Sequence, residues 1–153
     1  MLESPVARAK DRPDFMVFNE IAIIAQLAEN RLERTLPPGM SAAQFGLLNH
    51  FCRRGGEESP AQLASAFQVT KGAMTNTLQR LQAQGFIRVA PHGEDGRKKL
   101  ISITPEGVTA HGQAILALRP YFASLREAFT DGEFEAALPF LRAMRAWLDD
   151  NRG

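Results

Sequence analysis

The positions where helices begin and end constrain the fold of this chain more than any other sequence feature. Ser41, Ser59 and Thr130 are each followed three residues later by Gln or Glu. In such a capping box the hydroxyl accepts a hydrogen bond from a backbone N–H of the first turn, and the later side chain bonds back to the cap. Glycine or proline turns end the preceding segments at 37–39, 55–56 and 85.

These signals predict helices over residues 14–36, 41–54, 60–67, 71–84, 105–129 and 131–150. Two short runs of strand-forming residues, 86–91 and 99–104, flank a glycine-containing turn and predict a β-hairpin. Pro120 and Pro139 fall inside the last two helices, where the apolar spacing continues past both, so we expect two kinked helices. The fold class is mainly α with one small β-hairpin.

Length and composition indicate one globular domain over residues 1–153, because 44% of the residues are hydrophobic. The single cysteine, Cys52, cannot form an internal disulfide, which favours a reducing compartment. The apolar run 21–25 is far shorter than the roughly 20 residues that span a bilayer, and residues 1–15 carry charges and prolines where a signal peptide is apolar. We expect a cytoplasmic protein with no membrane partner.

Charge is unevenly distributed along the chain. The net charge is only +1, yet residues 71–104 contain six basic residues against Glu94 and Asp95, a local charge of +4. The rest of the chain therefore carries −3. Because a concentrated positive charge creates a local field, this segment favours a polyanionic partner such as a nucleic acid.

The helix expected over residues 71–84 has an apolar and a polar face. Met74, Leu78 and Leu81 recur at helical spacing and should pack inward. The opposite face holds short polar groups, one cation and no carboxylate: Gly72, Thr75, Asn76, Gln79 and Arg80. Asn and Gln can each bond adenine through two hydrogen bonds, and Arg can do so with guanine. This face is predicted to contact DNA, with Thr70 as the helix cap and Lys71 beside it.

Gly72 is unusual inside a helix, where glycine costs roughly 0.5 to 1 kcal/mol relative to alanine. Two interpretations stay open. The missing Cβ could let the first turn approach a phosphate, which the free N–H groups of a helix start also favour. Alternatively, it could allow tight packing against the preceding helix.

The expected hairpin tip carries three consecutive cations, Arg97, Lys98 and Lys99, beside two glycines. Arg97 suits a narrow A·T-rich minor groove, where negative potential is concentrated. Asp95 lies two residues before Arg97, close enough to orient its guanidinium. A solvated turn explains the tip equally well by itself, but the neighbouring polar helix face favours a DNA contact.

These features together resemble the MarR family of bacterial transcription regulators. The family's Asp-x-Arg wing pattern stands at 95–99, its helix-turn-helix at 60–87, and its entry into the next long helix at 103–107. The resemblance implies a winged helix-turn-helix over residues 37–104, flanked by N- and C-terminal dimerisation helices over 14–36 and 105–150. It also implies that helix 71–84 enters the major groove and that Asp95 and Arg97 of the wing reach the minor groove.

The expected DNA-binding residues are Thr70, Lys71, Gly72, Thr75, Asn76, Gln79, Arg80, Asp95, Arg97, Lys98 and Lys99. The partner is double-stranded DNA, expected to be a roughly palindromic operator whose half-sites lie about one helical turn apart. Two symmetric copies of the chain are required for such a site.

Both flanking helices carry an apolar stripe that suits another helix. The first stripe is Phe18, Ile21, Ala25, Ala28 and Leu32, widened by Val17, Ile24 and Leu27. The second is Phe134, Leu138, Leu141, Met144 and Leu148, with Phe140 and Trp147 beside it. Because these stripes are broader than one neighbouring helix covers, they predict a homodimer.

Many relatives respond to small aromatic or phenolic acids bound between the dimer helices and the winged heads. The resemblance therefore implies a repressor that a small-molecule effector releases from DNA. Phe45, His50, Phe51 and His111 are the candidate lining residues, although each also fits a core or surface role. Cys52 could act as a redox switch, but a buried thiol serving as a small apolar group is favoured.

Two other classes of function compete with this interpretation. An enzyme could use His50, Cys52, His92 and His111, but these residues fall on separate elements, and no C-x-x-C, H-E-x-x-H, phosphate loop or nucleophile elbow occurs. We expect no catalytic residue, metal or cofactor. A winged helix used only for protein contact would show no steep salt dependence of binding, whereas DNA binding would.

Overall fold

The computed structural model describes residues 12–94 and 96–152. Asp95, one of the expected DNA-binding residues, lies outside them. The chain divides into two compact units, Met1–Ala117 and Leu118–Gly153, and the division falls inside helix α6 (Pro105–Ala128).

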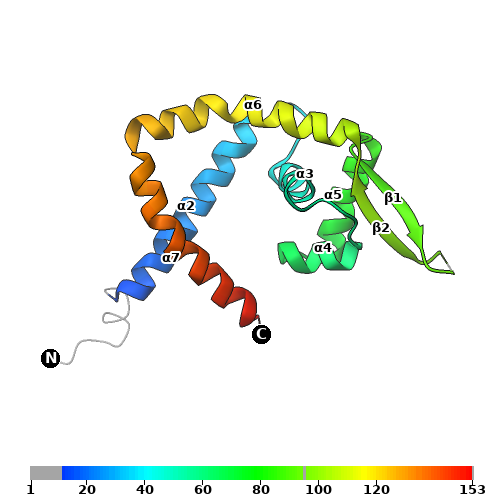
Figure 1. Ribbon diagram of the computed structural model, residues 1–153, viewed down its shortest axis with the longest axis horizontal. Helices are drawn as coiled ribbons and strands as arrows, with labels where there is room; N and C mark the ends of the chain where they lie inside the picture. The colour runs from blue at the N-terminus through cyan, green and yellow to red at the C-terminus, as the bar shows by residue number, and fades with distance from the viewer. Residues whose placement is uncertain (1–11, 95, 153) are drawn as a thin grey trace. The chain divides into compact units, whose positions relative to one another are not determined.

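The first unit contains helices and one hairpin in the expected order (Figure 1). Its elements are α2 (Pro13–Thr35), α3 (Ala42–Arg54), α4 (Pro60–Phe67), α5 (Lys71–Ala83), β1 (Ile87–His92), β2 (Lys98–Ile103) and the first part of α6. The end of every element lies within one residue of its expected position. The sequence prediction of a mainly helical chain with one hairpin is confirmed.

The capping boxes fix where the helices begin. The Ser59 hydroxyl accepts a hydrogen bond from the backbone N–H of Gln62 at 3.2 Å, and the Gln62 amide oxygen accepts one from the N–H of Ser59 at 2.8 Å. The boxes at Ser41 and Thr130 are also complete. Thr70 caps α5 as expected, since its hydroxyl accepts from the N–H of Ala73 at 3.1 Å.

The core of the first unit lies between α3, α4, α5 and the hairpin. Its most deeply buried side chains are Leu47, Leu48, Phe51, Leu63, Leu81 and Ile101. Met74, Leu78 and Leu81 all face this core, as the helical spacing predicts. Because these three side chains share one face of α5, their burial turns its polar face outward.

The hairpin is an antiparallel pair in which Ile87 lies opposite Ile103 and His92 lies opposite Lys98. The backbone of Glu58 extends this pair, because it exchanges two hydrogen bonds with Ile101, at 3.1 and 2.8 Å. The wing is therefore joined to the segment that precedes α4.

The structure corrects one detail of the hairpin tip. Lys98 was expected in the connecting turn, but it belongs to strand β2, where it pairs with His92 and precedes Lys99, which pairs with Pro91. The ladder reaches one residue further than the alternation of residue types suggests. Successive residues of a strand point to opposite faces, so these two cations have different directions.

The second unit contains the remainder of α6 and helix α7 (Asp131–Asp150). Pro120 and Pro139 lie inside α6 and α7, which continue through them, so the expectation of two continuous helices in place of four short ones is confirmed. The rings of Phe129 and Phe134 pack edge to face across the α6–α7 turn, with centroids 6.0 Å apart. Among the described residues, no helix has the length and hydropathy needed to cross a membrane.

Gly107, in the first turn of α6, is required by a close backbone approach. A Cβ at this position would collide with the carbonyl oxygen of Phe86 and lie 2.7 Å from Cγ1 of Ile103. We expect Gly107→Ala to lower the free energy of unfolding by about 1 to 3 kcal/mol, because the backbone itself has to move. Urea denaturation of the purified protein measures this change.

Gly112→Ala is the matched control on the same helix. No described heavy atom lies within 4 Å of the position of its Cβ, so alanine is expected to stabilise the helix by about 0.5 to 1 kcal/mol. Equal effects of the two substitutions would contradict the close approach at Gly107.

Candidate nucleic-acid interface

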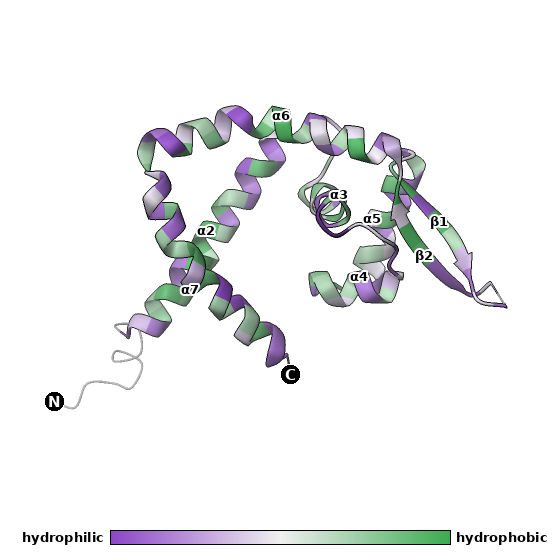
Figure 2. Ribbon diagram, viewed as in Figure 1, coloured by the Kyte–Doolittle hydropathy of each residue, from purple (hydrophilic) through white to green (hydrophobic). Residues whose placement is uncertain are grey.

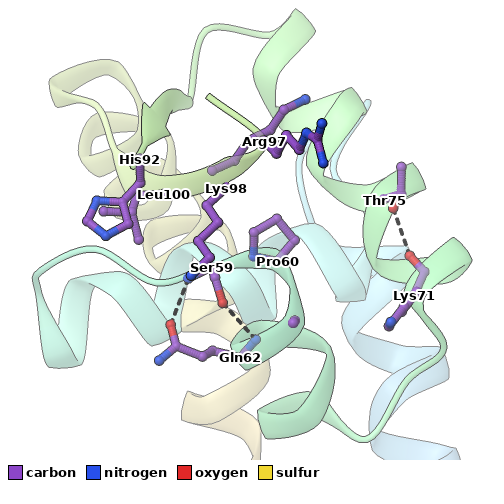
Figure 3. Close-up of a pocket in the computed structure, with 11 residues that line it drawn as sticks. Ser59, Pro60, Gln62, Lys71, Thr75, His92, Arg97, Lys98 and Leu100 are labelled. Carbon is purple, nitrogen blue, oxygen red and sulfur yellow. Dashed lines mark hydrogen bonds between the residues drawn. The ribbon is translucent and has the colours of Figure 1, made fainter. Parts of the chain in front are cut away.

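The outer face of α5 is fully available to a ligand. All of its expected DNA-binding residues are exposed: Lys71, Gly72, Thr75, Asn76, Gln79 and Arg80. The hydroxyl of Thr75 donates to the carbonyl oxygen of Lys71 at 2.8 Å, which leaves the Thr75 methyl group for an outside contact (Figure 3). The face therefore combines amide groups, one methyl group and cations, without a carboxylate.

Gly72 lies in the first turn of this helix, and the structure decides between its two interpretations. No described heavy atom comes within 4 Å of the position that a Cβ would occupy. Tight packing against the preceding helix is therefore wrong as an explanation. The remaining interpretation is a close approach from outside, at the helix end where unpaired N–H groups favour an anion.

An open cavity of about 720 Å³ lies between the start of α4, the first turns of α5 and the wing (Figure 3). Four cations contribute to its lining: Lys71, Arg97, Lys98 and Lys99. The other lining residues are Ser59, Pro60, Ala61, Gln62, Thr75, His92 and Leu100, so no described residue of the lining is acidic. The structure thus brings Lys71 and Thr75 of α5 together with the cations of the wing at one site. The other expected residues of α5, which are Gly72, Asn76, Gln79 and Arg80, lie on its exposed face outside the cavity lining.

The sequence prediction missed the start of α4 as part of this site. Residues 59–62 line the cavity, and the backbone at a helix start carries a partial positive charge. The capping box at Ser59 predicted where α4 begins. The position of this helix start beside the wing, however, depends on the bridge between Glu58 and Ile101. That contact joins residues too distant in sequence to be inferred from local pattern.

The four candidate effector residues separate into two groups. Phe51 is 1% exposed in the core, and beside it Nε2 of His50 lies 2.6 Å from Oε2 of Glu58. Phe45 and His111 are half-buried and stack between α3 and α6, with ring centroids 5.6 Å apart and planes 12° apart.

Asn49 completes the second group, because its Oδ1 lies 3.0 Å from Nε2 of His111. Partial burial lowers the pKa of His111, so its ring is neutral at pH 7. A neutral imidazole donates one hydrogen bond and accepts another, so the ring can bond a further polar group besides Asn49.

Cys52 corrects the expectation of a buried thiol, because it is exposed on α3. Leu48 and Phe51 occupy the inward face of that helix, and the next residue turns away from it. Partial desolvation raises the pKa of the Cys52 thiol above its ordinary value of 9.0. The reactive thiolate is therefore a small fraction at neutral pH.

Metal ligands do not gather in the part of the chain that the structure describes. No three His, Cys, Asp or Glu side chains in that part lie close enough to hold an ion. His50 and His111 are engaged with Glu58 and Asn49 respectively.

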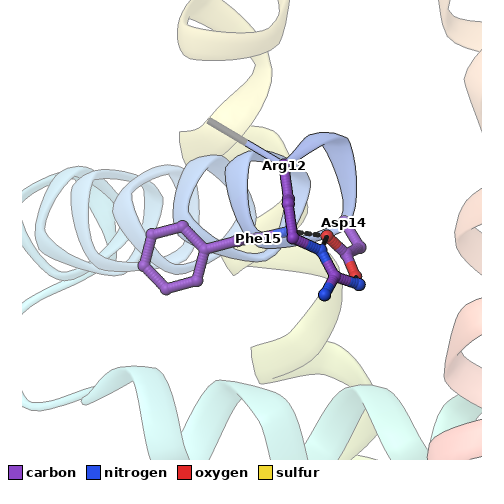
Figure 4. A network of polar contacts seen from close by, with 3 residues as sticks. All are labelled: Arg12, Asp14 and Phe15. Atoms are coloured by element: carbon purple, nitrogen blue, oxygen red, sulfur yellow. Dashed lines mark hydrogen bonds and ion pairs between the residues drawn. The ribbon is translucent and has the colours of Figure 1, made fainter. Parts of the chain in front are cut away.

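Large apolar side chains are exposed on α2 and on α7. Figure 2 shows hydrophobic residues along both helices. On α2 they are Phe15, Met16, Phe18, Ile23, Ile24 and Leu27. On α7 they are Phe134, Leu138, Phe140, Leu141, Trp147 and Leu148. At the start of α2, Arg12 pairs with Asp14 at 2.6 Å, and Phe15 points away from this ion pair (Figure 4). Such extensive apolar surface marks an interaction site.

Comparison with known sequences identifies the family. The model of the MarR family matches residues 39–98, from the turn before α3 to the start of β2. MarR of Salmonella typhimurium is 32% identical over 99 residues, which are 60% of this chain and 68% of that protein. The transcriptional regulator PecS of Dickeya dadantii is 29% identical over 105 residues, 63% of each chain. The match thus spans less than two thirds of the length of PecS and slightly more than two thirds of the length of MarR.

Two solved structures share the fold. A MarR mutant from E. coli, solved in complex with operator DNA, has a TM-score of 0.63 and 26% identity over 83% of this chain and 96% of its own. BpsR of Bordetella bronchiseptica, whose DNA binding is regulated by 6-hydroxynicotinic acid, has a TM-score of 0.72 and 22% identity over 85% of this chain and 98% of its own. None of these four proteins is named as an enzyme. With the matching family model and the 32% identity to MarR, the chain belongs to the MarR family of transcription regulators.

Proposed function

We propose that this protein is a sequence-specific DNA-binding regulator that acts as a homodimer. The observation that carries the proposal is the cationic cavity beside the exposed, carboxylate-free face of α5. A duplex requires both features, because phosphates supply affinity and base edges supply specificity. A regulator of chromosomal DNA would act in the cytoplasm.

In this proposal α5 enters the major groove. Asn76 and Gln79 are exposed amides that can each pair with adenine, and Arg80 can pair with guanine. The methyl group of Thr75 suits the methyl group of thymine, since the hydroxyl is already bonded to the backbone. Thr70 holds the helix start in place through its cap.

The cavity would receive the DNA backbone between α5 and the wing. Lys71, Lys98 and Lys99 contribute positive charge from two sides, and the start of α4 adds its partial charge. Arg97 would continue from there into the minor groove. The orienting role of Asp95 for Arg97 remains part of the proposal.

A second copy of the chain would cover the apolar faces of α2 and α7. Leu27 and Trp147 are each 63% exposed, which is costly for large apolar side chains in water. We therefore assign residues 37–104 to DNA binding and residues 14–36 and 105–150 to dimerisation. Two winged heads related by a two-fold axis would read a roughly palindromic operator.

The proposal includes repression that a small aromatic acid relieves. BpsR supplies the precedent, because 6-hydroxynicotinic acid regulates its DNA binding. Among the candidate residues, the stacked pair of Phe45 and His111 is the better site, since both side chains are partly exposed. Phe51 and His50 lie in the core, where a ligand could reach them only after rearrangement.

Arg97 and Gln79 are expected to affect DNA binding differently. Arg97→Ala should weaken binding to every sequence and reduce the slope of log K against log salt by about 1. Gln79→Ala should weaken operator binding by about 1 to 3 kcal/mol and leave random DNA almost unaffected. Fluorescence anisotropy over a salt series measures both effects.

Gln113→Ala is the control, because it removes an exposed glutamine of α6 outside the expected DNA face. If the affinity of the parent protein for its partner does not depend on salt concentration, the result favours the alternative function, a winged helix that contacts only protein.

Gly72→Ala is expected to change stability and DNA binding in opposite directions. Stability should rise by about 0.5 to 1 kcal/mol, because the Cβ enters open space and alanine favours a helix. DNA affinity should fall, because the methyl group occupies the space of the approaching backbone. Thermal denaturation and anisotropy provide the two values.

Gly112→Ala serves again as the comparison for this pair of measurements. It should raise stability without any change in DNA affinity. Parental DNA affinity in Gly72→Ala would remove Gly72 from the interface.

The homodimer predicts a mass of two chains in sedimentation equilibrium at micromolar concentration. Leu27→Asp should shift the protein toward monomer and lower its operator affinity, because a carboxylate would be buried among apolar side chains. Asn30→Asp introduces the same charge at an exposed polar position of α2 and should leave the dimer intact. A parent that sediments only as monomer rules out this part of the proposal.

Redox control through Cys52 is the less favoured alternative. Because the thiol pKa is raised above 9.0, the rate of alkylation by iodoacetamide should climb steeply with pH and still be rising at pH 9. Cys52→Ser should bind operator like the parent, before and after mild peroxide treatment. If peroxide released the parent protein from operator DNA but did not release Cys52→Ser, the redox interpretation would be favoured again.

A further inference from the structure

Gln84, directly after α5, takes part in a chain of hydrogen bonds that reaches α3 and the turn after α2. Nε2 of Gln44 donates to Oε1 of Gln84 at 2.7 Å, and Nε2 of Gln84 donates to the carbonyl oxygen of Gly39 at 3.0 Å. Gly39 belongs to the turn between α2 and α3, and its φ of +84° suits glycine.

Gln44 determines the donor and acceptor roles in this series of hydrogen bonds. Oε1 of Gln44 accepts from the backbone N–H of Ser41 at 2.8 Å, in the capping box of α3. The amide NH₂ group of Gln44 must then face Gln84, so Gln84 presents its oxygen to Gln44 and its own NH₂ group to Gly39. Gln44 is only 3% exposed, and loss of its partner would leave a buried donor unsatisfied.

Thr104, which directly precedes α6, contacts Gly85 and Phe86, the two residues that follow Gln84. Thr104 donates from its hydroxyl to the carbonyl oxygen of Gly85 at 2.6 Å and from its backbone N–H to that of Phe86 at 3.0 Å. The missing Cβ of Gly107 lets the first turn of α6 approach Phe86. Residues 84–86 therefore receive contacts from the turn after α2 and from the start of α6.

We propose that residues 84–86 form the joint that couples α2 and α6 to the DNA-reading helix, with Gln84 as a positioning residue for α5. This inference rests on the proposed function and goes beyond it, because Gln84 would act without touching DNA. Lys71 and Gly72 lie at the other end of a 13-residue helix, roughly 20 Å from the joint. A small tilt at the joint therefore displaces Lys71 and Gly72 by ångströms, and displaces Asn76 and Gln79, which lie nearer the joint, by less.

In this proposal, a movement of the flanking helices changes the position of the DNA-reading helix α5 through only a few hydrogen bonds. Movement of the turn after α2 changes the position of the Gly39 carbonyl oxygen, which Gln84 follows through its hydrogen bond. Movement of the start of α6 acts on Gly85 and Phe86. Both inputs act on the residues that directly follow α5 and would therefore change the orientation of this helix.

Gln84→Met tests the proposal in the full-length protein, because methionine keeps the length of the side chain and removes both hydrogen bonds. Gln82→Met is the matched control, an exposed glutamine two residues earlier. Operator and random DNA affinities are measured by anisotropy, and backbone hydrogen exchange is measured by mass spectrometry without DNA. Thermal melts confirm that each variant is folded at the temperature used.

The expected result for Gln84→Met has three parts. Operator affinity falls about ten-fold, which corresponds to the loss of one or two neutral hydrogen bonds. Random DNA affinity and its salt slope stay at the parental values, because the cations are unchanged. Exchange becomes faster at residues 36–41 and 82–86 and stays constant at 98–103. Gln84→Glu retains only the bond from Gln44, so its operator affinity is expected between those of the parent and Gln84→Met.

Unchanged exchange at the joint overturns the proposal, as does unchanged operator affinity. An equal loss of operator and random DNA affinity also overturns it, since a general loss of folded protein would have that effect. If the parent bound no DNA, the proposed function would fail, and the exchange measurement alone would decide whether Gln84 holds the joint.

Discussion

The burial of three side chains of α5 determines the position of everything else in the first unit. Met74, Leu78 and Leu81 lie in the core with Phe51 and Leu63, and each fully buried side chain of this size contributes about 1.5 to 3 kcal/mol. Because a helix repeats every 3.6 residues, the same packing sends Asn76 and Gln79 to the surface. Specificity is therefore a consequence of core packing, because the buried side chains determine which face of α5 points outward.

The two ends of α5 have different physical roles. Its start is open, because no described heavy atom lies within 4 Å of the Cβ position of Gly72, and Lys71 lines the cationic cavity. Its end is crowded, since Gln84, Gly85 and Phe86 accept or donate bonds to segments on both sides. An open end suits a ligand that approaches and leaves, whereas a crowded end suits the transmission of force. The exposed apolar faces of α2 and α7 supply a reason why the chain would work as a pair.

Local sequence signals were sufficient for the secondary structure and for much of the site. Capping boxes and glycine stops depend on residues three or four apart, so the elements were predicted to within one residue. The exposed face of α5 followed from its apolar spacing. Features that depend on tertiary contacts were missed: Gln44 and Gln84 are 40 residues apart, and the start of α4 reaches the cavity through Glu58 and Ile101. Cys52 was misplaced because α3 has one buried face, and Cys52 falls outside it.

The central claim is that two copies of this chain read one DNA site. It is tested most directly by selection of the fragments of its own genome that the purified protein binds at physiological salt. The account predicts enrichment of an inverted repeat whose half-site centres lie about 10 base pairs apart. A selected pool without a shared motif, or a motif with a single unrepeated half-site, would contradict it.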